Sequence, residues 1–170
     1  DKMVVFSQWT SMLDVISSRA RELGIKFARL DGSMGMSERE RQQELFKTSP
    51  DCNMFLISLK AGGMGLNLTQ ANHVVLMDPW WNPFVEQQAI DRIYRIGQKK
   101  NIHVYKLYMS FTIEEWMNNL KMIKLEKSNI AIGKCDFTMG ISGSLGQKEI
   151  DGLFQYVNTY VGELSRRINK

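Results

Sequence analysis

The chain has 170 residues, which is enough for one domain or for one domain with a short appendage. A hydrophobic fraction of 44% excludes an intrinsically disordered chain, and a net charge of +4 permits nucleic acid binding without requiring it. Cys52 and Cys135 have neither the density of a disulfide scaffold nor the spacing of metal ligands, so we predict reduced thiols and no metal centre.

The sequence contains no signal peptide and no long uncharged apolar run. This absence predicts a soluble intracellular protein with no membrane partner. The chain opens on an apolar run without an initiator methionine, which is typical of a piece of a longer protein.

Short apolar runs and helical periodicities alternate along the first part of the chain. Residues 3–6 are apolar on both faces, as a buried parallel strand is, and a helical pattern follows up to Gly24. A second strand is predicted over residues 25–30. Ser37 and Glu40 form a capping box, which predicts a helix from there to about residue 48.

The second part continues the alternation. We predict strands over 54–57, 73–77 and 102–108, a Gly-rich loop over 58–68, a loop over 78–83 and a long helix from Thr112. Asn82 as N-cap and Pro83 at the first helical position start a further helix. The pattern weakens from residue 133, where we predict a flexible loop over 138–146 and an amphipathic helix over 153–168.

The predicted fold is therefore α/β, a parallel β-sheet with helices on both faces, plus a C-terminal helical appendage. We place the main domain at residues 1–132 and the appendage at residues 133–170.

The helix that Pro83 starts is predicted to continue through residues 88–98. In that case Gln88, Arg92 and Arg95 lie on one face, while Ala89, Ile93 and Ile96 form the apolar stripe that seats the helix. Arginine stays charged and its planar fork suits phosphate oxygens, so this face suits a polyphosphate. The alternative is a solvated face on which an arginine pairs with Asp91 or Glu86.

Polar loops follow four of the predicted strands, at Ser7–Gln8, 31–33, 58–67 and 78–83. In an open parallel sheet these loops share one edge, where ligands gather. Backbone N–H groups of the Gly-rich loop can approach an anion and Lys60 adds charge, although glycines of a tight turn are an equal alternative. The chain has no Gly-Lys-Ser/Thr phosphate loop and no Asp-Glu pair to hold Mg²⁺. We expect it to complete a nucleotide site whose phosphate loop and metal ligand lie elsewhere.

Five segments in this order resemble helicase motifs IV to VI, in particular those of the second RecA-like lobe of Swi/Snf-type ATPases in helicase superfamily two. The segments are Phe6-Ser7-Gln8-Trp9, Leu30-Asp31-Gly32-Ser33, Ser58-Leu59-Lys60-Ala61-Gly62-Gly63-Met64-Gly65-Leu66-Asn67-Leu68, Asp78-Pro79-Trp80-Trp81-Asn82-Pro83 and residues 88–98. The resemblance covers residues 3 to about 130. The variants at Leu59-Lys60 and Pro79-Trp80 are similar to the DNA-repair subgroup, whose members often carry a RING ubiquitin ligase module.

The resemblance implies a RecA-like fold and a role for each matching residue. Arg92 and Arg95 match arginine fingers that reach ATP bound on the N-terminal lobe, which also holds Mg²⁺. Gln88, Gly63 and Gly65 match positions beside the nucleotide. The matches to DNA-contacting positions are Ser7, Gln8, Ser58, Lys60 and Trp81.

The implied function is the C-terminal ATPase lobe of a nuclear double-stranded DNA translocase, inactive without its N-terminal lobe. The implied partners are double-stranded DNA, that lobe, and nucleosomes or repair proteins. Two alternatives stay open: a catalytically degenerate lobe that serves as a DNA or protein docking module, and an RNA-unwinding enzyme of the same superfamily. The Trp-Asn-Pro triplet at 81–83 and the Arg-Ile-Gly-Gln ending at 95–98 count against the RNA enzyme.

Overall fold

A computed structural model of the chain describes residues 1–62, 65–131, 151–152 and 155. The chain forms two compact units, one of residues 1–80 and 84–108 and one of residues 81–83 and 109–170. The predicted domain boundary at residue 132 stays a prediction. The loop predicted over 138–146 lies outside the described residues, as does nearly all of the helix predicted over 153–168.

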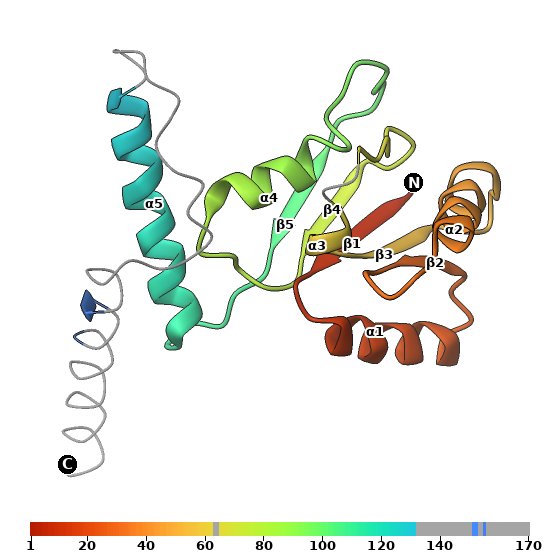
Figure 1. The fold of residues 1–170 in the computed structure, drawn as a ribbon, viewed down its shortest axis with the longest axis horizontal. Helices are drawn as coiled ribbons and strands as arrows, with labels where there is room; N and C mark the ends of the chain where they lie inside the picture. The colour runs from red at the N-terminus through yellow and green to blue at the C-terminus, as the bar shows by residue number, and fades with distance from the viewer. Residues whose placement is uncertain (63–64, 132–150, 153–154, 156–170) are drawn as a thin grey trace, which may run out of the picture. The chain divides into compact units, whose positions relative to one another are not determined.

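The first unit is built on a five-stranded sheet in the order β2-β3-β1-β4-β5 (Figure 1). Each neighbouring pair is parallel, which confirms the predicted parallel sheet. Strands β2 and β5 are shorter than the apolar runs that predict them. The strands are β1 (Met3–Ser7), β2 (Phe27–Leu30), β3 (Met54–Ser58), β4 (His73–Leu76) and β5 (His103–Lys106).

The described helices are α1 (Thr10–Glu22), α2 (Met36–Thr48), α3 (Leu59–Gly62), α4 (Pro83–Ile90) and α5 (Ile113–Ala131). The capping box predicted at Ser37 is wrong, because α2 begins at Met36 with Gly35 as its N-cap. The carboxylate of Glu38 instead accepts hydrogen bonds from the side chains of Arg41 and Gln42 in the same helix. Helix α3 is a single turn where the sequence predicts a loop.

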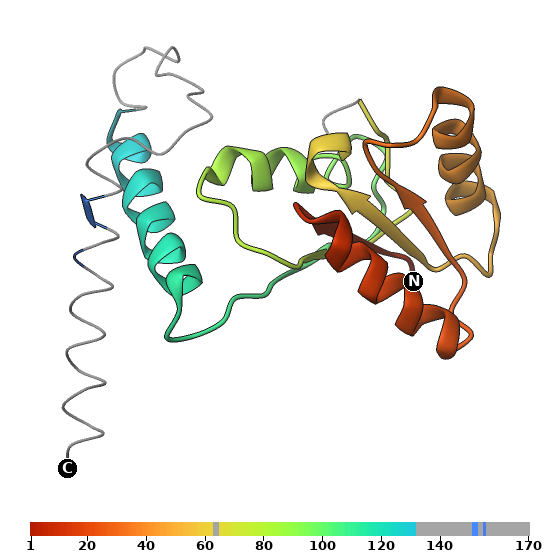
Figure 2. The ribbon, with the colours of Figure 1, turned by 60° about the horizontal axis from the view of Figure 1, so that its bottom comes forward.

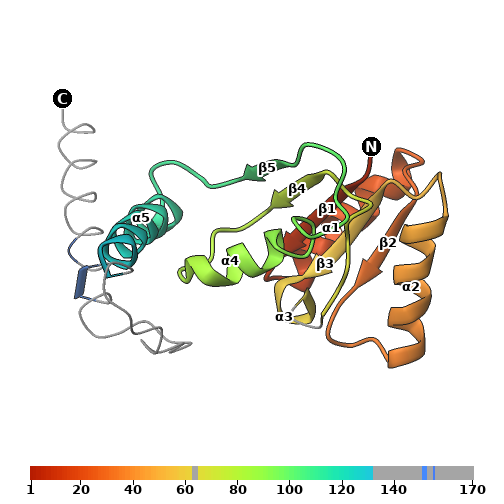
Figure 3. The ribbon, with the colours of Figure 1, turned by 90° about the horizontal axis from the view of Figure 1, so that it is seen from above.

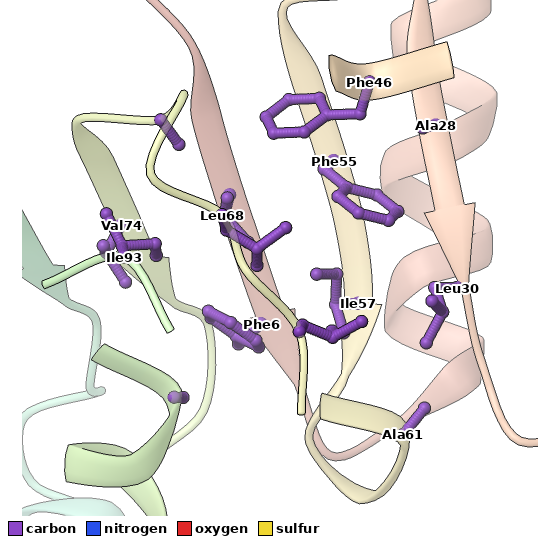
Figure 4. Close-up of a cluster of buried hydrophobic side chains, with 14 of the residues drawn as sticks. Phe6, Ala28, Leu30, Phe46, Phe55, Ile57, Ala61, Leu68, Val74 and Ile93 are labelled. Atoms are coloured by element: carbon purple, nitrogen blue, oxygen red, sulfur yellow. The ribbon is translucent and has the colours of Figure 1, made fainter. Parts of the chain in front are cut away.

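Helices cover both faces of the sheet, as predicted (Figures 2 and 3). Figure 4 shows the larger cluster of buried side chains, which combines sheet residues with Phe46 of α2, Ala61 of α3 and Ile93. Helix α4 adds Ala89 to the same cluster. On the other face, Leu13 of α1 packs with Val5 and Leu56. The nearly continuous burial of β1 and β3 follows from this two-sided cover.

Among the residues that the structure describes, no helix is both long enough and apolar enough to cross a membrane.

The contact of α1 with the sheet makes a stability prediction. Leu13 is fully buried, so Leu13→Ala should lower the free energy of unfolding by about 2–5 kcal/mol through lost burial and a residual cavity. Leu23→Ala is the matched control, since Leu23 ends the same helix with 57% of its surface exposed, and should change stability by less than about 0.5 kcal/mol. Urea unfolding of the two variants measures both values. Equal losses would contradict this packing.

Candidate functional site

The three central strands end together at one edge of the sheet. Ser7 at the end of β1 is in register with Ser58 at the end of β3, and Phe6 is in register with Leu76 at the end of β4. Because all three strands run the same way, the segments that follow them start side by side. The predicted gathering of polar loops at the carboxyl edge is confirmed for these strands.

The segments after β1 and β4 are joined by a buried carboxylate. The hydroxyl of Ser7 donates to Asp78 Oδ2 at 2.9 Å, and the backbone N–H of Gln8 donates to the same oxygen at 2.6 Å. Ser7 Oγ also accepts from the backbone N–H of Trp9 at 3.0 Å. Ser7 is 0% exposed, so its hydroxyl serves this internal network and has no surface for a DNA phosphate.

Ser58 is similarly used inside the protein. It is 3% exposed, and its hydroxyl accepts from the backbone N–H of Ala61 at 3.3 Å, which caps the single turn of α3. The neighbouring polar side chains are accessible: Lys60 on α3 is exposed and Gln8 is partly exposed. In the segments after β1 and β3 the serine is therefore the inner residue and a longer polar side chain is the outer one.

The Gly-rich segment returns to the sheet beyond α3. Gly65 has a φ of +54°, the left-handed conformation that glycine adopts without strain. Leu66 and Leu68 are buried in the larger core cluster and anchor the segment there. Gly63 lies outside the described residues.

The helix predicted through residues 88–98 is wrong in its length, because α4 ends at Ile90. Residues 91–98, which we call the arginine turn, continue in tighter turns, with Ile93 N–H donating to Ile90 O at 2.9 Å and Gln98 N–H to Arg95 O at 3.0 Å. Gln88 therefore does not share a helical face with the two arginines. Ile93 is buried as predicted, but Ile96 is fully exposed and belongs to no apolar stripe.

Bonds to the segment after the Gly-rich loop shape the arginine turn. Arg92 O accepts from the backbone N–H of Leu68 at 2.9 Å, and Arg95 Nη1 donates to Leu66 O at 3.4 Å. The side-chain amide of Gln98 donates to Ala71 O at 2.7 Å. The turn is thus held along residues 66–71, and the Arg95 guanidinium lies beside the residue that follows Gly65.

A second buried carboxylate anchors α4. Glu86 Oε1 accepts from the backbone N–H of Trp80 at 2.9 Å, and Oε2 binds Lys106 Nζ of β5 at 3.1 Å. The Asp91 carboxylate accepts from the amide of Gln87 at 2.9 Å. Sequence reasoning missed the positioning roles of Asp78, Glu86 and Gln98. The clue available was that Asp78 and Gln98 are polar residues inside matching motifs with no direct ligand role assigned, and that Glu86 lies between two of these motifs.

A third carboxylate orders the segment after β2. Asp31 Oδ1 accepts from the backbone N–H and the hydroxyl of Ser33, and Oδ2 binds Arg29 Nε at 2.9 Å. Burial by itself raises the pKa of Asp31, but the bonds from Ser33 and Arg29 outweigh it and hold that pKa below its usual range. Asp31 is therefore ionised at neutral pH and fixes the turn.

The remaining predicted site residues are dispersed. Gln88 is exposed on α4. Trp81 is half-buried and belongs to the second unit. In the described part of the chain, no group of three or more His, Cys, Asp or Glu side chains could hold a metal ion.

Comparison with known proteins places this chain in a family. Residues 1–97 match the helicase conserved C-terminal domain. The chain is 43% identical over 157 residues to DNA repair protein rad8 of Schizosaccharomyces pombe and 48% identical over 124 residues to DNA repair protein RAD5B of Arabidopsis thaliana. These alignments cover 92% and 73% of this chain but only 13% and 10% of the relatives.

A solved structure shows the same fold. The C-terminal part of the Fun30 ATPase domain matches with a TM-score of 0.76 and 30% sequence identity, over 98% of this chain and 48% of that one.

The chain therefore belongs to the family of helicase conserved C-terminal domains, with an α/β RecA-like fold. More narrowly, it is similar to the helicase C-terminal lobes of Swi/Snf-like DNA repair and chromatin remodelling proteins. The resemblance stated from the motifs is confirmed at both levels.

The Asp31 network makes a pH-dependent prediction. Asp31→Asn should lower the free energy of unfolding at pH 7 by about 1–3 kcal/mol, because charge-assisted bonds are lost in a buried turn. The pKa of Asp31 is lowered by folding, so its contribution is complete above the unfolded value of about 3.9 and is lost as pH falls below it. The difference from the parent chain should therefore shrink between pH 7 and pH 3, as measured by urea unfolding.

Asp51→Asn is the matched control, because Asp51 forms an exposed pair with Lys26 at 2.8 Å. An exposed pair contributes less than about 1 kcal/mol. A gap for Asp31→Asn that stays constant over this pH range would contradict an ionised, bonded carboxylate.

Proposed function

We propose that this chain is the C-terminal ATPase lobe of a double-stranded DNA translocase, and that Arg92 and Arg95 act on ATP bound by the N-terminal lobe of the same protein. The observation that carries the proposal is the arginine turn. It places the Arg95 guanidinium beside the Gly-rich segment, with Nη1 3.4 Å from Leu66 O, just after the end of α4. Two arginines beside a Gly-rich segment suit a phosphate chain.

The chemistry needs no proton transfer by this lobe. ATP supplies the phosphoryl group that is transferred, with Mg²⁺ held by the N-terminal lobe. A guanidinium keeps its charge at neutral pH, and Arg95 is anchored at one nitrogen while the rest of its fork can reach phosphate oxygens. Arg92 and Arg95 would stabilise negative charge that develops on those oxygens, and the exposed Gln88 would bond to the nucleotide or a nearby loop.

DNA binding is assigned to outer residues at the carboxyl edge of the sheet. Gln8 and Lys60 are accessible and would contact the phosphate backbone of DNA. Trp81, which belongs to the second unit, would lie near the DNA strand along which the protein moves. Ser7 and Ser58 take a positioning role in this proposal, since both are buried. Contacts to phosphates carry no sequence information, so binding would be largely sequence-independent.

The relatives named as DNA repair proteins support a nuclear location for this protein. They also support nucleosomes or repair proteins as partners of the whole protein. The chain spans only a small part of those relatives, so activity is proposed for the whole protein and not for these residues alone.

The arginine assignment is tested in the full-length protein. Arg92→Ala and Arg95→Ala should each lower DNA-stimulated ATP hydrolysis about a thousandfold, the scale of an arginine finger, while DNA binding changes little. Arg95→Lys should also be strongly impaired, because it keeps the charge but loses the planar fork. ATP turnover and DNA affinity are measured side by side.

Arg19→Ala is the control, since Arg19 is an exposed residue of α1 paired with Glu22, and should behave as the parent protein. Turnover near the parent level in both alanine variants would overturn the arginine assignment. A full-length parent protein without ATP hydrolysis would favour the docking-module alternative.

The DNA assignment is tested by salt dependence. Lys60→Ala in the full-length protein should weaken binding similarly on unrelated double-stranded sequences and lower the salt slope of affinity by about one. Lys47→Ala is the control, because Lys47 lies exposed in the last turn of α2, away from the carboxyl edge of the sheet. An unchanged slope for Lys60→Ala would remove Lys60 from the DNA interface.

A further inference from the structure

Two buried carboxylates hold the segment that connects β4 to α4. Asp78 opens that segment and is 7% exposed, and Glu86 lies in α4 and is 1% exposed. A buried carboxylate is costly unless hydrogen bonds satisfy it. Each of these is satisfied by at least one backbone N–H group, so each fixes main chain as well as side chains.

The bonds of Asp78 all go to the segment after β1. Its carboxylate takes the hydroxyl of Ser7 and the N–H of Gln8, and that hydroxyl oxygen takes the N–H of Trp9. The path of three successive residues is therefore determined by one carboxylate on the neighbouring strand's loop. Gln8 is partly exposed and is the member proposed to contact a DNA phosphate.

Glu86 makes bonds within the connection between β4 and α4 and to β5. They reach Trp80, two residues beyond Asp78, and Lys106 of β5 at 3.1 Å. Glu86 thereby fixes α4 against the sheet, and α4 leads directly into the arginine turn after Ile90. The position of Arg92 and Arg95 depends on this helix.

We propose that these two carboxylates are positioning residues with separate targets: Asp78 sets the DNA-contacting segment at Gln8, and Glu86 sets the arginine turn. Neither touches DNA or ATP. The inference rests on the proposed function and deepens it. It assigns the DNA-contacting part of the site to the bonds of Asp78 and the ATP-contacting part to the bonds of Glu86.

The division predicts that the two alanine variants change different kinetic parameters of the full-length protein. Both parameters come from ATP hydrolysis measured against the concentration of double-stranded DNA. Asp78→Ala should raise the DNA concentration for half-maximal stimulation about tenfold, with turnover at saturating DNA within about twofold, since a lost charge-assisted bond is worth at least that factor. Glu86→Ala should lower turnover at saturating DNA about tenfold and leave half-saturation within about twofold.

Conservative variants separate positioning from folding. In Asp78→Asn the amide oxygen can still accept from Gln8 N–H, and the amide nitrogen can donate to Ser7 Oγ while that hydroxyl turns to Trp9 O, now at 3.1 Å. In Glu86→Gln the oxygen can still accept from Trp80 N–H. Each should restore most of the parameter that its alanine counterpart loses. Ser7→Ala, which removes only a hydroxyl, should shift half-saturation in the same direction as Asp78→Ala.

Asp51→Ala is the control, because Asp51 precedes β3 and so lies at the amino edge of the sheet with 65% of its side chain exposed. Two outcomes would overturn the inference. In the first, both alanine variants lower turnover equally and leave half-saturation unchanged, as simple destabilisation does. In the second, both variants shift the DNA concentration for half-maximal stimulation. If Arg92→Ala and Arg95→Ala both retain full turnover, the proposed arginine assignment fails instead. An Asp78→Ala protein that does not fold leaves Ser7→Ala to decide, and unchanged half-saturation there counts against the inference.

Discussion

The parallel pairing of β1 with both β3 and β4 is the constraint on which the rest of this lobe depends. It aligns the ends of three buried strands, so segments far apart in sequence begin at one edge. Cover on both faces makes that alignment rigid, because a slip of one residue would turn apolar side chains such as Phe6 and Ile57 away from the larger cluster. A candidate site assembled from the segments that follow these three strands requires such a frame.

Those features were predictable from sequence because they depend on local pattern. Residues 3–6 and 54–57 are apolar on both faces for the same reason that they are buried, and alternation with helical periods implies parallel strands. The start of α2 was harder to predict from the sequence. Ser37 carries the residues of a capping box, but the helix begins at Met36 with Gly35 before it, at the end of the turn that Asp31 and Ser33 form.

The arginine turn could not be predicted because its shape is set by residues about 25 positions away. Helical spacing continues through residue 98, yet the N–H of Leu68 and the carbonyl of Ala71 take partners from this stretch, at Arg92 O and the Gln98 amide. Burying Ile93 while exposing Ile96 is incompatible with one regular apolar stripe. Gly97, with φ at +104°, permits the departure.

Similarity of motifs also cannot separate a residue that contacts a ligand from one that holds the contacting residue in place. Ser7 and Ser58 match DNA-contacting positions, yet both hydroxyls are consumed inside the protein. A small hydroxyl is well suited to that inner place, since it can accept a backbone N–H and donate to a carboxylate at once. The longer neighbours Gln8 and Lys60 then extend outward. The motif is therefore better understood as two layers, an inner one of serines and buried carboxylates that fixes the backbone and an outer one of longer side chains that are accessible to a ligand.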